Sequence, residues 1–397
     1  MRILYLAHDL ADAAIPRRVR LLRDGGAIVR LVGLERGPSM ATAKKPEGRP
    51  IGVTYNGRLW QRIAAIIKAV LFFSSWRDEV PGADIILARS LEMLLIAVLV
   101  RARMRLATPI VYECLDIHRL MTRPGPAGWV LRSIEQRLLD LSALLIVSSP
   151  KFIDAYFEPT HHRLPPWLLL ENKLLSSDFE ANVVSDDPDP SRPNGPPWRI
   201  GWFGIIRCAR SLSLLADLVT ESQGTIEVEI YGRPARDVVP HFDAIVAATS
   251  GMYFGGRYDR AVDLPRLYGE VHFNWTLDFY EAGLNSDWLL PNRLYEGSMF
   301  GAVPIALRTV ETGRWLVGKS CGVVLEEPLQ QSLRQFFPQL DRASYRILQA
   351  DVKRLDKLAL METAESARRL VDRIRHLRDG DDTLTTNLES FEREISE

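Results

Sequence analysis

Residues 290–307 read LPNRLYEGSMFGAVPIAL, and this segment is the most informative one for the fold of the second half of the chain. Asn292 is typical of a helix start, and Gly301 is placed to end that helix. The apolar run Val303–Leu307 then predicts a short buried strand of a parallel sheet. Glu296 falls within the first two helical turns, near the positive end of the helix dipole. A carboxylate is stabilised there and can accept hydrogen bonds from the hydroxyl groups of a ligand.

This segment resembles the nucleotide-sugar-binding helix of GT-B glycosyltransferases, in the family 4-like group that builds bacterial exopolysaccharides. In that group an Asn-Lys/Arg-x-x-Glu run places its glutamate on the nucleotide ribose. The resemblance implies donor-binding roles for Asn292, Arg293 and Glu296. Retaining members often carry another glutamate eight positions earlier, where this chain has Trp288 with Asp287 beside it. Retention or inversion of the anomeric configuration is therefore left open.

Strand and helix signals alternate on both sides of a proline-rich segment. Runs such as Ile3–Ala7, Ile28–Gly33 and Ile110–Glu113 predict buried strands with helices between them. Residues 185–198 contain five prolines in fourteen positions, which predicts a linker because proline removes backbone donors. The alternation begins again at Arg199. Both halves are therefore expected to be parallel sheets flanked by helices.

The expected fold class is α/β, and the resemblance implies GT-B, with two Rossmann-like doubly wound domains facing across a cleft. An N-terminal acceptor-binding domain is expected over residues 1–184, followed by the linker at 185–198. A C-terminal nucleotide-sugar-binding domain is expected over 199–397, ending in terminal helices. One of these, over Ala364–Leu377, is amphipathic and rich in Arg.

Composition bounds the class of protein. The chain has 397 residues, 47% of them hydrophobic, with 50 Lys and Arg against 50 Asp and Glu. This balance disfavours a nucleic-acid partner. Residues 1–180 are basic, with 25 Lys and Arg against 18 Asp and Glu, which indicates either an anionic partner or ordinary scatter. Three widely spaced cysteines and the lack of an uncharged apolar run of about 18 residues predict a cytoplasmic protein.

The segment GWFGIIRCARSLSLL, residues 201–215, is the second group of residues that predicts ligand binding. A strand is expected to end at Gly204 and Ser211 to cap the next helix, with Arg207 and Arg210 in the loop between them. Two arginines beside a helix N-terminus form an anion site. The segment resembles the family's Gly-Arg…Lys-Gly loop, which implies that both arginines contact the donor diphosphate. The alternative is that both are solvated surface charges.

Two further features bear on the donor. Gly232 follows the next strand and permits a ligand to approach the backbone closely, although a plain turn is an equal alternative. The Asp-x-Asp match at 187–189 lies in the proline-rich segment. The resemblance implies a metal-independent enzyme, so no metal site and no cofactor are expected beyond the nucleoside-diphosphate-sugar donor.

The N-terminal half is expected to hold the acceptor and any general base. Glu113, Asp116 and His118 follow or end a predicted buried strand and could take a proton from an attacking hydroxyl in an inverting mechanism. A histidine in a loop is, alternatively, a surface or capping residue. Acceptor contacts are expected from a second set of residues after other strands: His8, Asp9, Arg17 and Arg89.

Residues 58–77, RLWQRIAAIIKAVLFFSSWR, combine apolar and aromatic side chains with basic ones. This composition suits a helix lying in the headgroup region on the inner face of a membrane, where the enzyme would reach a lipid-linked acceptor. The equal alternative is a buried helix of the first domain with a basic outer face.

The leading hypothesis is a glycosyltransferase that moves one sugar from a nucleoside-diphosphate-sugar to a hydroxyl of a lipid-linked oligosaccharide. Its finer pattern resembles the transferases of succinoglycan-type exopolysaccharide assembly. One alternative is a GT-B-fold sugar-nucleotide epimerase, which would need no lipid acceptor. The other is a non-catalytic, degenerate transferase that serves as an assembly partner.

Overall fold

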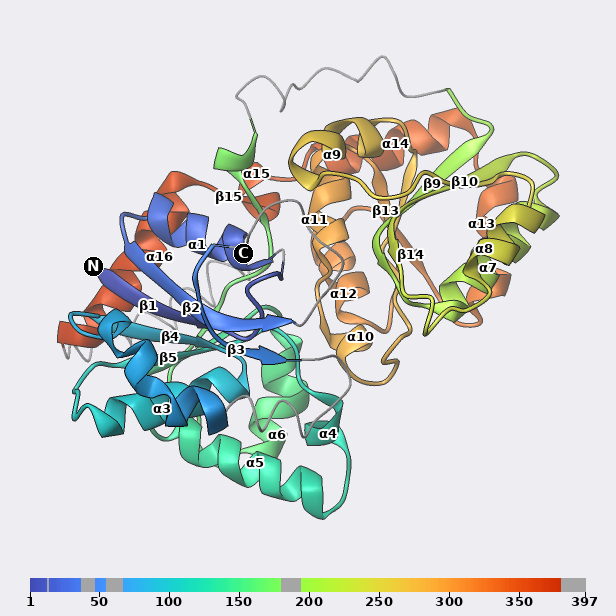
Figure 1. Ribbon diagram of the computed structural model, residues 1–397. Coiled ribbons are helices and arrows are strands. Elements are labelled where there is room, and N and C mark those ends of the chain that lie inside the picture. Colours follow the sequence, from blue (N-terminus) through green and yellow to red (C-terminus); the bar gives the residue numbers. More distant parts are fainter. Residues whose placement is uncertain (13, 37–46, 55–66, 180–193, 380–397) are drawn as a thin grey trace. The chain divides into compact units, whose positions relative to one another are not determined.

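The computed structural model describes residues 1–12, 14–36, 47–54, 67–179 and 194–379. The chain forms two compact units, one made of residues 1–171 with 362–397 and the other of residues 172–361. Each unit contains a parallel sheet flanked by helices (Figure 1). The prediction of two α/β halves is confirmed.

The first unit is built on a parallel sheet whose described strands lie in the order β3-β2-β1-β4-β5-β6-β7. Helices α1 and α16 lie on one face of this sheet, and α3 and α5 on the other (Figure 1). Every residue of β4, β5 and β6 is buried, as expected for strands covered on both faces. The strands are β1 (Arg2–Ala7), β2 (Ile28–Arg36), β3 (Arg49–Thr54), β4 (Ile85–Arg89), β5 (Ile110–Cys114), β6 (Leu144–Val147) and β7 (Trp167–Leu169). The helices are α1 (Ala14–Asp24), η1 (Phe73–Ser75), η2 (Arg77–Glu79), α3 (Leu91–Arg103), α4 (Arg119–Thr122), α5 (Pro126–Leu139), η3 (Ile153–Phe157), α6 (Glu158–Thr160) and α16 (Ala364–Asp379).

The second unit repeats this plan with the strand order β11-β10-β9-β12-β13-β14, and a small sheet joins β8 to β15. The strands are β8 (Leu174–Leu175), β9 (Trp198–Ile206), β10 (Ile226–Pro234), β11 (Met252–Phe254), β12 (Phe273–Trp275), β13 (Val303–Leu307), β14 (Val323–Leu325) and β15 (Met361–Glu362). The helices are η4 (Ser176–Asp178), α7 (Ala209–Glu221), α8 (Phe242–Ala248), α9 (Arg260–Gly269), α10 (Asn285–Trp288), α11 (Asn292–Met299), α12 (Glu311–Gly318), α13 (Leu329–Gln339), α14 (Arg342–Lys353) and α15 (Lys357–Leu360). Its core is rich in aromatic side chains such as Trp198, Trp202 and Phe273.

The stretch at 290–307 forms the helix and strand that its sequence predicts. Helix α11 begins at Asn292 and ends at Met299, and β13 is buried at every residue. Gly301 has a φ of 71°, a backbone conformation that residues with a Cβ rarely adopt. The glycine therefore reverses the chain between the helix and the strand.

The boundary between the units differs from the expected linker at 185–198. The structure changes units between residues 171 and 172, and residues 185–193 lie outside the described part of the chain. The terminal helix was expected in the second domain, but α16 belongs to the first unit. It packs on α1, and Arg378 Nη1 lies 2.9 Å from Asp84 Oδ1 next to β4. Local amphipathicity predicts a buried helix face but not which sheet buries it.

The basic and apolar stretch 58–77 is described only from residue 67 onward. Trp76 is 1% exposed and donates its indole N–H to the carbonyl of Ala69, at 3.0 Å, so this ring is not part of an outer surface. Leu71 and Phe72 are exposed. Among the described residues, no helix is both long and apolar enough to cross a membrane.

Candidate functional site

Glu296 is positioned by α11 and held by a neighbouring helix of the second unit. Its side chain is buried, and Oε1 accepts a hydrogen bond from Arg260 Nε of α9 at 2.6 Å. The hydroxyl of Tyr268 lies 3.4 Å from Oε2. Burial lowers the pKa of Arg260, but the Glu296 carboxylate outweighs this effect and raises it. Glu296 is thus a fixed carboxylate, and no sequence signal pointed to Arg260 as its partner.

The other two residues of the Asn-Arg-x-x-Glu run lie at the start of α11. Asn292 is exposed, and Arg293 donates from Nη1 to the carbonyl of Trp275 at 3.3 Å. Gly297 lets the helix approach β12, because a Cβ there would lie 2.2 Å from Asn274 Nδ2. This close packing fixes the position of α11 relative to the end of β12.

The two arginines of the 201–215 segment lie close to the loop that follows β12. Arg207 Nη2 is 3.2 Å from Asp278 Oδ2, and its guanidinium lies over the ring of Tyr280. Arg210 Nη2 is 2.7 Å from Glu327 Oε1, and its guanidinium lies over a phenylalanine ring of the same loop. Both side chains remain partly exposed. The two guanidinium groups are therefore positive charges that solvent can reach at the start of α7.

Two glycines meet where β9 and β10 pair. Gly204 and Gly232 are register partners, and a Cβ at Gly232 would lie 1.8 Å from the carbonyl oxygen of Gly204. Strand β9 continues past Gly204 to Ile206, so the predicted strand end is wrong by two residues. The predicted helix cap is also wrong. Cys208 caps α7, with its Sγ accepting from the backbone N–H of Ser211, while the Ser211 side chain is buried within the first turns.

The predicted donor residues therefore come from neighbouring elements of one unit. Gly204 and Gly232 lie toward the carboxyl ends of adjacent strands, and the arginines lie between β9 and the first turn of α7. Helix α11 follows β12, the other neighbour of β9. Ligands of open α/β sheets bind at this carboxyl edge.

In the first unit, Glu113 is a buried structural carboxylate. It is fully buried in β5, accepts from Tyr5 Oη at 2.7 Å and Arg18 Nε at 2.6 Å, and lies 3.7 Å from Arg89 Nη1. Burial acts to raise its pKa, but the two guanidiniums and the Tyr5 hydroxyl outweigh burial and lower it. The expectation that Glu113 faces a ligand as a general base is wrong, because its oxygens are already occupied inside the core.

The other two candidate bases are exposed. His118 accepts a hydrogen bond at Nδ1 from the backbone N–H of Leu120 at 3.3 Å and so caps α4. Asp116 is exposed beside it. The capping role that was the alternative for His118 is present, and a role for either side chain in proton transfer stays a prediction.

The predicted acceptor residues divide into buried and accessible ones. His8 Nε2 lies 3.5 Å from Asp12 Oδ2, and burial together with nearby Arg89 lowers the His8 pKa. Asp9 is buried and accepts from the backbone N–H of Ala11 at 3.0 Å, so it shapes the turn after β1. Arg17 is half-buried on α1. Arg89 is only 2% exposed and donates from Nη1 to Tyr5 Oη at 2.9 Å, and a ligand contact for it stays a prediction.

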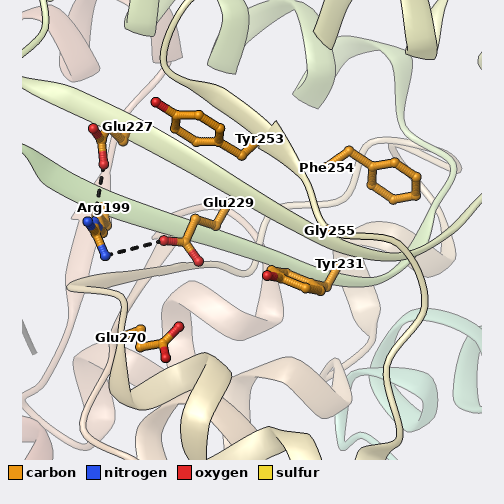
Figure 2. A pocket seen from close by; sticks show the side chains of 8 residues that line it. All are labelled: Arg199, Glu227, Glu229, Tyr231, Tyr253, Phe254, Gly255 and Glu270. Carbon is orange, nitrogen blue, oxygen red and sulfur yellow. Dashed lines mark hydrogen bonds and ion pairs between the residues drawn. The ribbon is translucent and has the colours of Figure 1, made fainter. Parts of the chain in front are cut away.

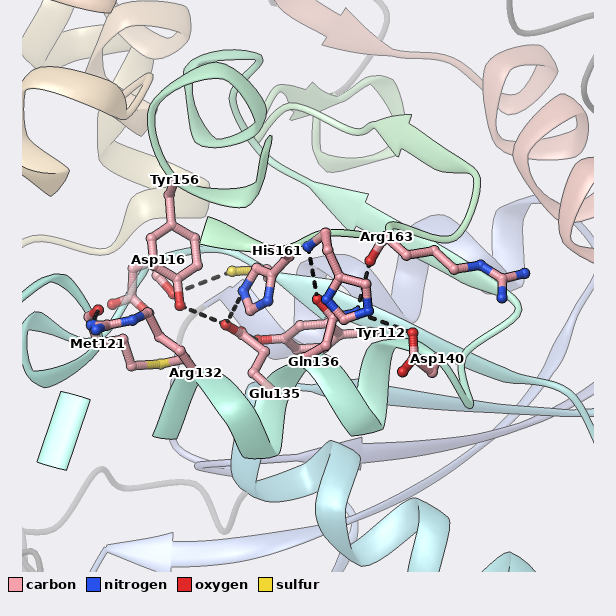
Figure 3. A network of polar contacts seen from close by, with 12 residues as sticks. Tyr112, Asp116, Met121, Arg132, Glu135, Gln136, Asp140, Tyr156, His161 and Arg163 are labelled. Carbon is pink, nitrogen blue, oxygen red and sulfur yellow. Dashed lines mark hydrogen bonds and ion pairs between the residues drawn. The ribbon is translucent and has the colours of Figure 1, made fainter. Parts of the chain in front are cut away.

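A second polar network stabilises the interior of the first unit (Figure 3). The carboxylate of Glu135 on α5 is 1% exposed, and it accepts hydrogen bonds from Tyr112 Oη at 3.1 Å and Tyr156 Oη at 2.5 Å. His161 Nε2 lies 2.9 Å from the same carboxylate. Both oxygens of the Glu135 carboxylate have side-chain partners inside the unit, which indicates a structural role for these groups.

The second unit also carries a surface pocket of about 370 Å³, shown in Figure 2. Its charged centre is Arg199, whose Nε lies 3.1 Å from Glu227 Oε2 and whose Nη1 lies 3.6 Å from Glu229 Oε1. Burial raises the pKa of Glu229. The pocket lining is Arg199, Glu227, Glu229, Tyr231, Tyr253, Phe254, Gly255 and Glu270. None of the predicted donor residues lines it.

Within the described part of the chain, no group of three or more His, Cys, Asp and Glu side chains could hold a metal ion. No family model matches the chain. A curated relative, the succinoglycan biosynthesis protein ExoL of Rhizobium meliloti (strain 1021), is 46% identical over 334 residues. The alignment covers 84% of this chain and 83% of that protein.

Solved structures share the fold at low sequence identity. Sucrose-phosphate synthase from Thermosynechococcus elongatus matches with a TM-score of 0.71 at 14% identity, covering 96% of this chain and 100% of that one. Anabaena HepE in complex with UDP and glucose matches with a TM-score of 0.64 at 13% identity, covering 94% and 98%. The chain therefore belongs to the family of the succinoglycan biosynthesis protein ExoL, and its fold is that of the GT-B glycosyltransferases.

Proposed function

We propose that the protein is a glycosyltransferase that moves one sugar from a nucleoside-diphosphate-sugar to a hydroxyl of a lipid-linked oligosaccharide during exopolysaccharide assembly. The observation that carries this proposal is the cluster at the carboxyl edge of the second sheet. There Arg207 and Arg210 flank the start of α7 near Gly204, and Glu296 is fixed on α11. Membership of the ExoL family supports a role in exopolysaccharide assembly.

The chemistry of this cluster suits a diphosphate leaving group. Negative charge builds on the departing diphosphate during glycosyl transfer, and guanidinium groups stabilise it through charge-assisted hydrogen bonds. Asp278 and Glu327 form ion pairs with the two arginines. The diphosphate would compete with these carboxylates, and Glu296 would accept from the ribose hydroxyls. HepE binds UDP and glucose in its crystal, which supports UDP as the first nucleotide to try.

Calorimetric titration with UDP, GDP and ADP tests the donor site. We expect one nucleotide to bind, and Arg207→Ala or Glu296→Gln to weaken it roughly tenfold or more, since a hydrogen bond to a charged group contributes about 1.5–3 kcal/mol. The matched control is Arg334→Ala. Arg334 is similarly exposed and pairs with Glu221 at 2.7 Å, at the far end of α7 from Arg210. This control is expected to leave nucleotide affinity unchanged.

Failure of all three nucleotides to bind the folded protein would contradict the proposal and favour a non-catalytic assembly partner. Binding that is insensitive to Arg207 and Glu296 would show that the nucleotide occupies another site. Interconversion of the donor sugar without any acceptor would favour the epimerase.

We also propose that the enzyme meets its lipid-linked acceptor at the inner face of the membrane, as a peripheral protein. The basic excess of residues 1–180 and the exposed side chains of Leu71 and Phe72 support this placement. Leu71→Asp with Phe72→Asp should weaken co-flotation with anionic lipid vesicles. The control is Ile347→Asp, which alters an exposed apolar residue of the second unit. Equal flotation of all three proteins would contradict the proposed contact.

A further inference from the structure

Three side chains at the carboxyl end of β1 and β4 leave buried polar atoms without a hydrogen-bond partner among the described residues. These atoms are Nδ1 of His8, Nε and Nη2 of Arg89, and Oγ of Ser90. The two strands pair in parallel with Leu6 opposite Ala88, so His8 and Ser90 follow at the same edge of the sheet. Buried polar atoms in folded proteins nearly always have a partner, which is either protein, water or a ligand.

Arg89 presents an organised pair of donors. Its Nη1 is occupied, because it donates to Tyr5 Oη at 2.9 Å and lies 3.7 Å from Glu113 Oε2. Nε and Nη2 form the other edge of the planar guanidinium, and this edge matches the two oxygens of an oxyanion. Glu113 is shared with Arg18, at 2.6 Å. Glu113 is one carboxylate shared by two guanidiniums and neutralises only one of them, while Asp12 adds negative charge near Arg89.

Ser90 adopts a backbone conformation that is unusual for a residue with a side chain. Its φ is 87°, a region that favours glycine, and such strain is often found at binding sites. Ser90 precedes α3, yet its hydroxyl makes no capping hydrogen bond to the helix. The Ser90 hydroxyl therefore lies next to Arg89 in the sequence and does not cap the helix.

His8 and Asp12 are the part of this cluster that reaches solvent. Their side chains are 23% and 32% exposed, whereas Arg89 is 2% exposed. Asp12, Glu92 and Asp116 surround His8 with negative charge. Only a group that reaches the Arg89 edge itself would be held.

We propose that Arg89, Ser90 and His8 form an oxyanion subsite in the first unit, which binds a phosphate or carboxylate group of the acceptor. This inference rests on the proposed glycosyltransferase function and names the chemistry by which its acceptor is recognised. The Arg89 edge supplies two N–H donors and Ser90 a third donor. His8 can add a donor to the same group as the tautomer that carries its proton on Nδ1.

The test follows the Arg89 Nε–H signal by ¹H–¹⁵N NMR of the full chain, with the signal assigned from its loss in Arg89→Lys. Inorganic phosphate and glucuronate are titrated separately, with glucose as the neutral control. We expect a saturable shift with at least one of the two anions and none with glucose. A response to phosphate alone assigns the subsite to a phosphate group, and a response to glucuronate alone to an acidic sugar.

Ser90→Gly keeps the test independent of folding, because glycine accepts a φ of 87° without strain. We expect this variant to weaken anion affinity at least roughly threefold by removing one hydrogen bond. The matched control is Ser320→Gly, at another serine with a positive φ, 51°, on the second unit. It should leave the affinity unchanged.

An Arg89 signal that responds to neither anion, in protein that still binds a nucleotide, would overturn the subsite and leave the glycosyltransferase function standing. The same result would assign the unpartnered atoms to internal water. An equal response to glucose would also overturn it, since the site would then not select an oxyanion. If the Arg89 signal responds to an anion but the protein binds no nucleotide, the proposed donor site is contradicted and the oxyanion subsite is not.

Discussion

Glu113 illustrates at the scale of one residue how burial decides the role of a carboxylate. The sequence places it in a polar run after an apolar strand, where a general base could lie. The structure places its oxygens between Tyr5, Arg18 and Arg89 in the core of the first unit. A carboxylate with these partners stays ionised and stabilises the fold instead of exchanging protons with a substrate.

The lowered pKa of Glu113 predicts a specific pH dependence of stability. Its carboxylate is ionised in the folded protein at pH values where an ordinary Glu, with a pKa of 4.5, is protonated. The stabilisation is therefore complete above about pH 4.5 and is lost as the pH falls through the folded-state pKa. Glu113→Gln should lower the free energy of unfolding by about 3 kcal/mol at pH 7.

Urea denaturation of both proteins at pH 7 and at pH 3.5 measures this difference, which should shrink at the lower pH. Glu365→Gln is the control, because this residue forms an exposed pair with Arg369 on α16. A Glu113 effect that is equal at both pH values would contradict the assigned ion network.

At the scale of elements, the packing of α16 on α1 depends on a glycine. A Cβ at Gly25 would lie 2.3 Å from the carbonyl oxygen of Ala367 and 2.6 Å from Cγ2 of Val371. The buried face of α16, formed by Ala367, Val371 and Ile374, needs this close approach. Gly25 thus permits the terminal helix to cover the first unit.

Gly25→Ala should destabilise the α1–α16 contact by about 1–3 kcal/mol, since the obstructing atoms include backbone that cannot move aside. Faster amide hydrogen exchange in α16 would be its signature. Gly26→Ala is the control, because its φ of 86° adds strain while a Cβ there meets nothing within 4 Å. If both variants change α16 exchange equally, the close approach at Gly25 is not what holds the helix.

At the scale of the whole molecule, the first unit is built from two separate parts of the sequence. Residues 1–171 and 362–397 form the first unit, while the second is continuous from 172 to 361. The chain therefore crosses between units twice. The terminal helix stabilises the unit that holds the proposed acceptor site, not the one that holds the proposed donor site.

Ending the chain after Thr363 should lower the thermal stability of the first unit, because the buried face of α16 is removed and apolar surface on α1 is exposed. Nucleotide affinity should remain, since the second unit keeps all its elements. Calorimetric unfolding with and without the nucleotide separates the two transitions. Loss of nucleotide binding in a protein whose second unit still folds would contradict this assignment.

The α/β class, the α11–β13 segment and the loop with two arginines could all be predicted from the sequence. Each of these depends on local patterns of apolar residues, glycines and helix ends, which act over a few neighbouring positions. The family relationship agrees with the resemblance of that segment to nucleotide-sugar-binding helices.

The sequence did not predict which charges are buried or which helix covers which sheet, because these features depend on the folded arrangement. Glu113 and Arg89 lie far from Tyr5 and Arg18 in the sequence, and α16 follows the second unit in chain order but packs on α1. Hydrogen-bond partners and packing faces are set by contacts between distant segments. Local periodicity does not encode these contacts, because it describes a single element and not its neighbours in space.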